Sequence, residues 1–394
     1  MRIVVIGGAG AMGRITVRDL AETAPPGIDL VVADRDAGAA RRLARGLRRR
    51  VTSVEADATV PASAARACRG ATAVINACHH DLNLRVMDAA LAAGAHYCDL
   101  GGLFHVTRRQ LGRDKEFLRA GLLALCGIGS APGIVNVMAH RGGRGLDPVE
   151  EIHIAVGTHD GRASSGRELL DTSYSIQTVL DEASQPAALF TGGEMTYVEP
   201  LSGAEPVRFP RPVGLQHPAI TLHSELATLP GFFNGAREVS FRIAFPGGLA
   251  DRLRLVRRLG LLSRVPVRVG DQRVVPRDVL LAMLAAGSRA TAAGPRDEYE
   301  VLRVIVRGRQ GRTRIERVLD CHVPGMPAWD VGVDIDTGAP PSIATQMLLA
   351  GTITARGVLP PERAIPPAPF FRELRRRGMR IVQRSRHARR DQSH

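Results

Sequence analysis

The stretch Arg2-Ile-Val-Val-Ile-Gly-Gly-Ala-Gly-Ala-Met-Gly13 opens the chain and decides its fold class. Its apolar half predicts a buried parallel strand, and the residues after it have the spacing of a helix. Between strand and helix lies Gly-x-Gly-x-x-Gly. The first glycine permits a tight turn, the second admits a pyrophosphate, and the third lets the helix pack on the strand. The residues expected to hold a dinucleotide at this turn are Gly8, Gly10, Ala11, Met12 and Gly13.

A second apolar run, Leu30–Asp34, ends in an acid 21 residues after Gly13. In dinucleotide-binding domains an acid at about this spacing binds the adenosine ribose hydroxyls. Asp34 favours NAD because it would repel a 2′-phosphate, whereas the adjacent Arg35 could pair with one. The sequence therefore predicts NAD as the cofactor and leaves NADP open.

Strand-like and helix-like segments alternate through the first 130 residues, which predicts a doubly wound parallel sheet. Ligands of such sheets bind beyond the carboxyl ends of the strands. Those ends place further candidates around the cofactor: Asp57, Asn76, Ala77, Asp99, Gly101, Ala131 and Pro132.

The pattern changes after Gly133 to longer strands without regular intervening helices. The expected strands are Val149–Gly157, Arg237–Phe245, Tyr299–Val306 and Arg312–Cys321, with helices near Leu169–Ala183 and Pro276–Ala286. An apolar helix over Ser342–Ala350 predicts a return to the first domain. We expect an α/β fold in which an α+β mixed-sheet domain, residues 131–337, interrupts a discontinuous Rossmann domain. The latter would hold residues 1–130 and 338–380, and a basic tail would hold residues 381–394.

The formal charge of +14 over 394 residues is concentrated in two segments. Arg35–Arg50 has seven arginines and one aspartate, and Arg372–His394 has nine arginines and two acids. With aromatic residues at only 4%, this pattern is typical of a solvated helix and tail, and nucleic acid is not an expected partner. The sequence shows neither a membrane-spanning apolar run nor a cleavable leader, so we expect a cytoplasmic protein without a membrane partner.

The five cysteines include no Cys-x-x-Cys pair, which argues against a disulfide framework or a zinc site. Adjacent His79 and His80 are not expected to face one ion together, and Cys321-His322 is isolated, so no metal is predicted. No Gly-x-Ser-x-Gly elbow indicates a serine hydrolase.

Seven motifs together resemble the saccharopine dehydrogenase-like family, most closely the L-lysine 6-dehydrogenases. They are Val4–Gly13, Val74–Ala77, Ala93–Gly102, Gly127–Ile134, Arg277–Leu281, Ser342–Gly351 and Arg356–Glu362. The resemblance implies a homodimer formed through the mixed sheet. It also implies NAD(P)-linked hydride transfer at a carbon that bears nitrogen, in the first place oxidative deamination of lysine or a similar amino acid. The alternatives are a reductase that joins an amine to an aldehyde or keto acid, as saccharopine and carboxyspermidine enzymes do, and a dinucleotide-binding protein without turnover.

An amino-acid substrate needs a group that accepts a proton from its ammonium and a group that binds its carboxylate. The candidates for catalysis are Asp99, His79, His80 and His223. Lysine dehydrogenases of this type carry an aromatic residue and a serine where this chain has Cys78-His79-His80, which leaves the substrate open. From the resemblance, Arg242 would bind the carboxylate, and Tyr174 and Thr228 lie in segments like the family's substrate segments.

Overall fold

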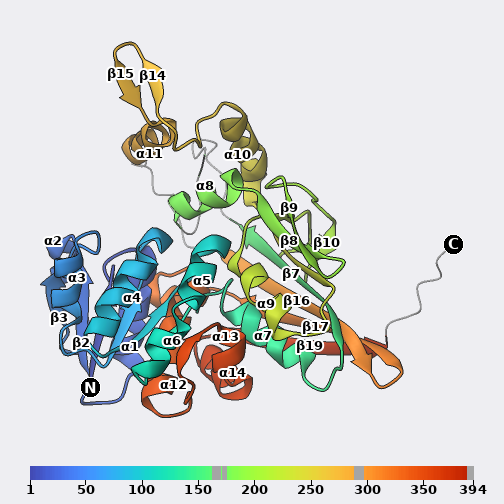
Figure 1. Ribbon diagram of the computed structural model, residues 1–394, viewed down its shortest axis with the longest axis horizontal. Helices are drawn as coiled ribbons and strands as arrows, with labels where there is room; N and C mark the ends of the chain where they lie inside the picture. The colour runs from blue at the N-terminus through green and yellow to red at the C-terminus, as the bar shows by residue number, and fades with distance from the viewer. Residues whose placement is uncertain (162–169, 171–174, 288–296, 388–394) are drawn as a thin grey trace.

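The computed structural model describes residues 1–161, 170, 175–287 and 297–387 (Figure 1). Its first sheet has seven parallel strands in the order β18-β6-β5-β4-β1-β2-β3. The strands are β1 (Arg2–Ile6), β2 (Asp29–Asp34), β3 (Thr52–Glu55), β4 (Ala73–Asn76), β5 (His96–Asp99), β6 (Leu123–Leu125) and β18 (Gly357–Leu359). The helices between them are α1 (Ala11–Thr23), α2 (Ala37–Arg45), α3 (Pro61–Cys68), α4 (Asn83–Ala92), α5 (Leu103–Leu111) and α6 (Asp114–Arg119).

Both faces of this sheet are covered, because successive side chains of each buried strand enter different cores. Ile3 and Val5 pack in the core that includes Ile15 of α1, whereas Val4 and Ile6 pack in the core that includes Ala64 of α3. Buried on both sides, β1 needs an uninterrupted apolar run, which its sequence supplies.

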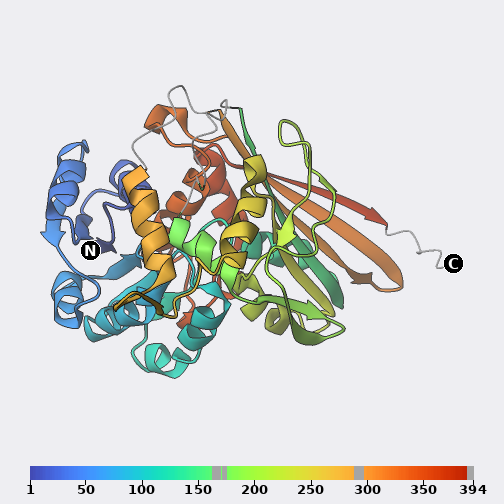
Figure 2. The same cartoon turned by 90° about the horizontal axis from the view of Figure 1, so that it is seen from above.

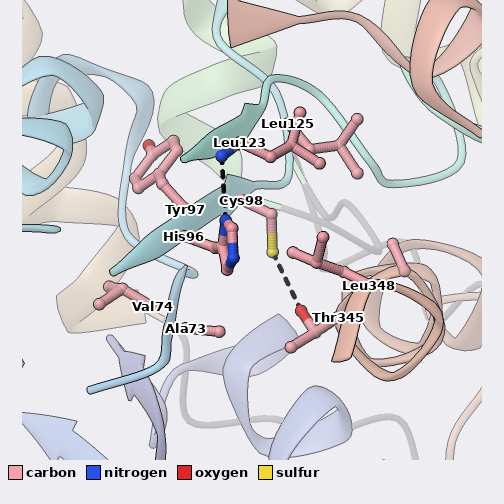
Figure 3. A pocket seen from close by; sticks show the side chains of 10 residues that line it. Ala73, Val74, His96, Tyr97, Cys98, Leu123, Leu125, Thr345 and Leu348 are labelled. Atoms are coloured by element: carbon pink, nitrogen blue, oxygen red, sulfur yellow. Dashed lines mark hydrogen bonds between the residues drawn. The ribbon is translucent and has the colours of Figure 1, made fainter. Parts of the chain in front are cut away.

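The chain returns to this domain through α12 (Ile335–Leu349), which packs against α1. The contact is close at Gly338, where an added Cβ would lie 2.5 Å from the Cβ of Ile15. Figure 3 shows Cys98 of β5 and Thr345 of α12 pointing toward each other at a small apolar pocket, where Thr345 Oγ1 lies 3.4 Å from Cys98 Sγ. Helices α13 (Pro361–Ala364) and α14 (Pro367–Arg376) complete this segment. The expected discontinuous Rossmann fold is confirmed.

The second sheet is mixed, as expected. Its strands run in the order β19-β17-β16-β7-β13-β8-β9, β12 also pairs with β13, and only the β7–β13 pair is parallel. Helix α7 (Ile134–Gly143) covers one face. The homodimer expected through this sheet stays a prediction, which a measurement of molar mass in solution would test. The strands are β7 (Val149–Asp160), β8 (Ala187–Thr191), β9 (Glu194–Val198), β12 (Ala219–Ile220), β13 (Glu238–Ile243), β16 (Glu298–Gln310), β17 (Thr313–Val323) and β19 (Arg380–His387).

A third group of elements forms an arm above the gap between the two sheets (Figures 1 and 2). The arm consists of α8 (Ile176–Ser184), α10 (Leu249–Arg258), β14 (Val267–Val269), β15 (Gln272–Val274) and α11 (Pro276–Gly287). The helix expected near Leu169–Ala183 corresponds to α8, which begins later than expected. Residues 162–169 and 171–174 lie outside the described residues. The β14–β15 hairpin was not expected from the sequence.

The basic tail is the main departure from expectation. Residues 380–387 form β19, which pairs with β17 at the edge of the mixed sheet. Arg384 and Arg386 reach back to the buried carboxylates of Asp320 and Glu316 at 2.5 and 2.7 Å. Alternating Arg and small polar residues satisfy these acids, so this part of the tail is a strand rather than a solvated extension.

No helix among the described residues is long and apolar enough to cross a membrane. All five cysteines are free thiols, and four of them are buried.

Candidate active site

The glycine turn after β1 leaves the start of α1 open to a ligand. A Cβ at Gly13 would lie 2.2 Å from the carbonyl oxygen of Gly7, so only glycine lets α1 pack on the strand end. Gly10 precedes α1 without a side-chain cap, and no acid lies in the first turn. The free N–H groups of that turn therefore fit a pyrophosphate.

The carboxylate of Asp34 lies beside this turn. Its Oδ2 accepts the N–H of Ala9 at 3.0 Å, and its Oδ1 accepts the N–H of Asp36 at 3.0 Å. Arg35 lies near Asp57, whose pKa is lowered mainly by a hydrogen bond from Thr59 and also by the Arg35 charge. Asp34 and Arg35, the residues expected at the adenosine side of the cofactor, therefore lie near the ends of β2 and β3. There they fit the ribose of a dinucleotide. When bound, the nicotinamide of such a cofactor supplies or accepts a hydride.

Asp99 is completely buried at the end of β5 and has no free oxygen for a substrate. Oδ2 accepts hydrogen bonds from Tyr97 at 2.9 Å and Gln110 at 2.6 Å. Oδ1 accepts the N–H groups of Gly101 and Gly127 at 2.9 and 2.7 Å. Burial raises the pKa of Asp99 although these bonds oppose the rise. We therefore correct the expected catalytic role: Asp99 holds the two glycine loops in place.

Asn76 is likewise used inside the protein. Its amide donates to Asn83 Oδ1 at 2.9 Å, and its Oδ1 accepts the N–H of Cys78 at 3.1 Å. The adjacent Ala77 lies next to the first glycine turn, because its N–H bonds to the carbonyl oxygen of Ile6 at 2.8 Å. These bonds shape the end of β4 without presenting the Asn76 side chain to a ligand.

The loop after β6 closes the same edge of the sheet. The Ala131–Pro132 peptide is cis, and Pro132 packs on the two glycines that Asp99 holds. A Cβ at either Gly101 or Gly127 would lie 2.8 Å from Pro132 Cγ. The sequence-predicted residues Gly101, Ala131 and Pro132 therefore form one compact wall at the nicotinamide end of the expected cofactor site.

His223 is buried and is held between two acids. Its Nδ1 is 2.9 Å from Glu225 Oε2 and its Nε2 is 3.4 Å from Glu182 Oε1. The ring stacks on Phe241 with centroids 3.6 Å apart. Burial opposes a charged imidazole, but the two carboxylates raise the pKa of His223 to about 10. The two carboxylates thus favour a charged imidazole at neutral pH, which argues against His223 as a general base.

A third buried acid, Glu362 of α13, lies near this pair. Asn136 of α7 donates to Glu362 Oε2 at 2.9 Å. Burial and the nearby charge of Glu225 raise the pKa of Glu362 to about 7, while polar contacts to Thr228 and Asn136 oppose the rise. A carboxyl group with a pKa near neutrality can both accept and donate a proton. The expected substrate residue Thr228 lies within this group.

Buried oxygens in this region are free to accept hydrogen bonds. Glu225 Oε1, Glu362 Oε1, Ser224 Oγ and Thr221 Oγ1 have no hydrogen-bond partner among the described residues. Buried polar atoms are normally paired, so four such atoms on two neighbouring segments indicate a binding site. Because the short turn that contains Glu225 (η2, Ser224–Ala227) packs against α5, this site borders the nicotinamide end of the Rossmann domain.

His79 and His80, at the end of β4, face the inserted domain. Their Nε2 atoms lie 3.5 and 3.4 Å from Oδ2 of Asp181 on α8. Arg277 and Arg264, from the arm, lie 2.5 and 3.0 Å from Oδ1 of the same carboxylate. Burial would raise the pKa of Asp181, but these histidines and Arg277 hold it well below its usual value.

Contrary to expectation, the donor atoms of the adjacent His79 and His80 lie close together. His79, His80 and Asp81 each offer a donor atom, and these atoms lie within 4.8 Å of one another. The rings converge because both turn toward Asp181. The two guanidinium groups on that carboxylate nevertheless oppose a bound cation, so we assign no metal to this cluster.

Arg242 lies away from the cleft, contrary to expectation. Successive residues of a strand point to opposite faces, and the preceding Phe241 already points toward His223. Arg242 instead bonds to Ser240 Oγ at 2.8 Å, Gly203 O at 3.2 Å and Glu205 Oε1 at 2.8 Å on the other face. Its guanidinium cannot reach a substrate beside His223. Tyr174, the other expected contact, lies outside the described residues.

A cavity of about 520 Å³ lies between the rim of the Rossmann domain and the arm, next to the Asp181 cluster. It is lined by charged residues of both signs, among them His80, Asp181, Arg257, Arg264 and Arg277. A cavity of this size admits an extended small molecule.

The sequence reasoning missed Glu182, Glu225 and Glu362. Glu362 belongs to one of the motifs quoted above, and Glu225 lies two residues from His223. The sequence feature that could have identified them is an acid within an otherwise apolar segment. A buried acid needs a partner that compensates its charge, so it marks a place where polar groups meet.

Known families match the chain along almost its whole length. The model of the saccharopine dehydrogenase NADP binding domain matches residues 3–125, and that of the saccharopine dehydrogenase C-terminal domain matches residues 129–379. The chain belongs to the saccharopine dehydrogenase family. Its cofactor is accordingly NAD(P), as expected, and the oxidoreductase class is supported.

Individual relatives are distant. The chain is 23% identical over 392 residues to carboxyaminopropylagmatine dehydrogenase from Synechocystis, covering 96% of both chains. It is 23% identical over 300 residues to carboxynorspermidine synthase from Vibrio alginolyticus, covering 70% of this chain and 71% of that protein. Saccharopine dehydrogenase (L-Glu forming) from Saccharomyces cerevisiae has the same fold. Its TM-score is 0.73 at 17% identity, with 98% and 99% of the two chains covered.

Proposed function

We propose that this family member joins an amine to an aldehyde or keto compound and reduces the resulting imine to a secondary amine with NAD(P)H. Condensation of the two substrates releases one water. Reduction of the C=N bond then consumes one hydride and one proton and leaves NAD(P)+. In reverse, the same site would oxidise a C–N bond and hydrolyse the imine.

The observation that carries this proposal is the pair of buried acids beside His223, Glu225 and Glu362, each with one oxygen that no described residue contacts by a hydrogen bond. Carboxylate oxygens that have no protein donor suit the N–H groups of an ammonium substrate. The site borders the wall formed by Gly101, Ala131 and Pro132, so a bound amine would lie next to the nicotinamide end of the cofactor.

Each residue has a distinct task in this scheme. Glu225 pairs with His223 through Oε2, and its other oxygen, Oε1, accepts an N–H of the substrate. Glu362, with its pKa near 7, takes the proton that an ammonium must lose before its nitrogen can attack a carbonyl carbon. The same carboxyl group returns a proton to the nitrogen when the C=N bond is reduced.

The relatives favour a two-substrate reaction over the deamination of lysine that the resemblance implied. The names of the Synechocystis and Vibrio proteins describe carboxylated polyamine-like products, and the Synechocystis protein is similar over nearly the full chain. Lysine oxidation uses the same groups in the opposite direction and stays the second candidate.

The test is a spectrophotometric assay at 340 nm with NADH and NADPH. Carboxylate-bearing aldehydes and keto acids are combined with amines that include agmatine, a diamine, glutamate and lysine. We expect cofactor oxidation only when both a carbonyl compound and an amine are present. Oxidation of lysine alone with NAD, without need of a second substrate, would select the second candidate. No turnover in either direction would reject both.

A further inference from the structure

Three separate parts of the chain meet at the carboxylate of Asp181, a residue that is only 1% exposed. His79 and His80 come from the rim of the Rossmann domain, Asp181 from α8 of the arm, and Arg264 and Arg277 from the part of the arm that follows α10. Asp181 is therefore the point where the two sides of the cleft are joined.

The next residue on the same helix faces the candidate site. Glu182 Oε1 lies 3.4 Å from Nε2 of His223. Consecutive helical residues point about 100° apart, so α8 presents Asp181 to the domain rim and Glu182 to the imidazole. Any rotation or shift of α8 that breaks the first contact also displaces the second.

The charges around Asp181 are arranged to fix this helix. Arg277 is buried, with 3% exposed, and it also donates to the carbonyl oxygen of Gln177 on α8 at 2.6 Å. Arg264 bridges Asp181 to Asp81, which follows the two histidines. Buried charge-assisted contacts of this kind have defined geometry, so the cluster determines how α8 lies relative to the end of β4.

We infer that Asp181 is a positioning residue, which, together with His79 and His80, holds α8 across the cleft so that Glu182 stays against His223. The inference rests on the proposed function for its meaning in catalysis, since His223 and Glu225 form the proposed amine site. It assigns the histidine pair, which departs from lysine dehydrogenases of this type, to the joining of the domains rather than to proton transfer.

The test follows the titration of His223 in the full-length protein without any substrate. Histidine labelled with ¹³C at Cε1 gives a separate NMR signal for each imidazole, and the signal missing from His223→Gln assigns the one of interest. The variants are Asp181→Asn, Glu182→Gln and their double variant. Asp251→Asn serves as a control because it breaks an exposed ion pair on α10.

Glu182→Gln removes one of the two carboxylates and is expected to lower the His223 titration midpoint by about one pH unit, a tenfold loss of proton affinity. Asp181→Asn should lower the midpoint in the same direction, and the double variant should match Glu182→Gln alone, because the first change acts through the second residue. Asp251→Asn should leave it unchanged.

A midpoint that stays at the wild-type value in Asp181→Asn, while the unfolding temperature falls, would show a structural role only and overturn the inference. The inference would also be overturned if the midpoint shift in the double variant equalled the sum of the shifts in the two single variants. If Asp181→Asn does not fold, His79→Asn/His80→Asn keeps the Asp181–Arg277 pair and must shift the midpoint in the same way. The titration needs no turnover, so its result is independent of whether the proposed reaction is observed.

Discussion

Nδ1 of His223 lies 2.9 Å from Oε2 of Glu225, while the other oxygen of Glu225 has no hydrogen-bond partner among the described residues. One carboxylate thus does two things. It stabilises the charged imidazole with one oxygen and leaves the other without a partner in the described part of the chain. A buried acid in this arrangement suits a cationic substrate, because the imidazole contacts one oxygen of Glu225 and leaves the other able to accept an N–H.

Replacing Glu225 by Gln tests this relationship. Glutamine keeps the shape but loses the charge that the ammonium needs, so kcat/KM should fall by at least ~100-fold, with a smaller effect on cofactor affinity. Glu205→Gln is the matched control, because Glu205 is an exposed acid on the other face of the mixed sheet. Steady-state kinetics with both substrates measure the effect. Equal losses of kcat/KM in Glu225→Gln and Glu205→Gln would contradict the role of Glu225 in binding the amine.

Glu362 makes stability depend on pH in a direction unusual for an acid. Its pKa is about 7 in the folded protein, above the ordinary 4.5 of a glutamate. Between these values the folded state binds a proton that the unfolded state has released, so stability falls as pH rises. The stabilising contribution of this proton is complete below pH 4.5 and lost once the pH exceeds 7.

Glu362→Gln should therefore stabilise the protein more at pH 8 than at pH 5. The gain at pH 8 is on the order of 3 kcal/mol at most, and the same change should lower kcat strongly. Urea unfolding at both pH values measures it, with Glu194→Gln, an exposed glutamate on β9, as the control. An equal change in stability at both pH values would show that Glu362 has no raised pKa.

Arg242→Ala should leave catalysis nearly intact. Its guanidinium bonds to Ser240, Gly203 and Glu205 on the face of the sheet opposite Phe241 and His223. We expect KM for either substrate to change by less than about twofold, since a change this far from the site acts on local stability only. A tenfold rise in KM for the carboxylate-bearing substrate would restore the role that the family resemblance gave to this arginine.

We expect Asp34 and Arg35 to decide whether NADH or NADPH binds more tightly. Asp34→Ala removes a charged acceptor for the ribose hydroxyls, so the Kd for NADH should rise about tenfold, while NADPH binding should be unchanged or improved. Arg35→Ala should weaken NADPH alone. Titration by nicotinamide fluorescence measures both constants. Tighter binding of NADPH than NADH by the unchanged protein would show that Arg35 outweighs Asp34.

The Rossmann domain could be predicted from the sequence because its signals are local. The glycines before α1, the acid that ends β2 and the apolar run of β1 each act within a few residues of their own positions. The return of α12 could also be expected, since an apolar helix needs a second buried surface. Strand β19 could not be predicted, because its arginines contact Asp320 and Glu316 only when two distant segments of the chain pair.

The candidate site was harder to predict because its parts come from four separate segments. His223 and Thr228 were expected there, but their acidic neighbours come from α8 and α13. Asp99 shows the opposite case. A strand-end acid beside a glycine pair indicates a site residue, yet its oxygens are filled by Tyr97, Gln110 and two backbone N–H groups. Only the packed structure shows which acids keep a free oxygen.

The most direct test of the proposed reaction follows hydride and nitrogen together. The protein is supplied with NADH or NADPH deuterated at the transferred position, a carbonyl substrate and a ¹⁵N-labelled amine, and the products are weighed by mass spectrometry. We predict one product that contains both substrates minus the oxygen of the carbonyl group, with one deuterium and the ¹⁵N label. An alcohol that carries the deuterium, with the amine left unchanged, would contradict the account.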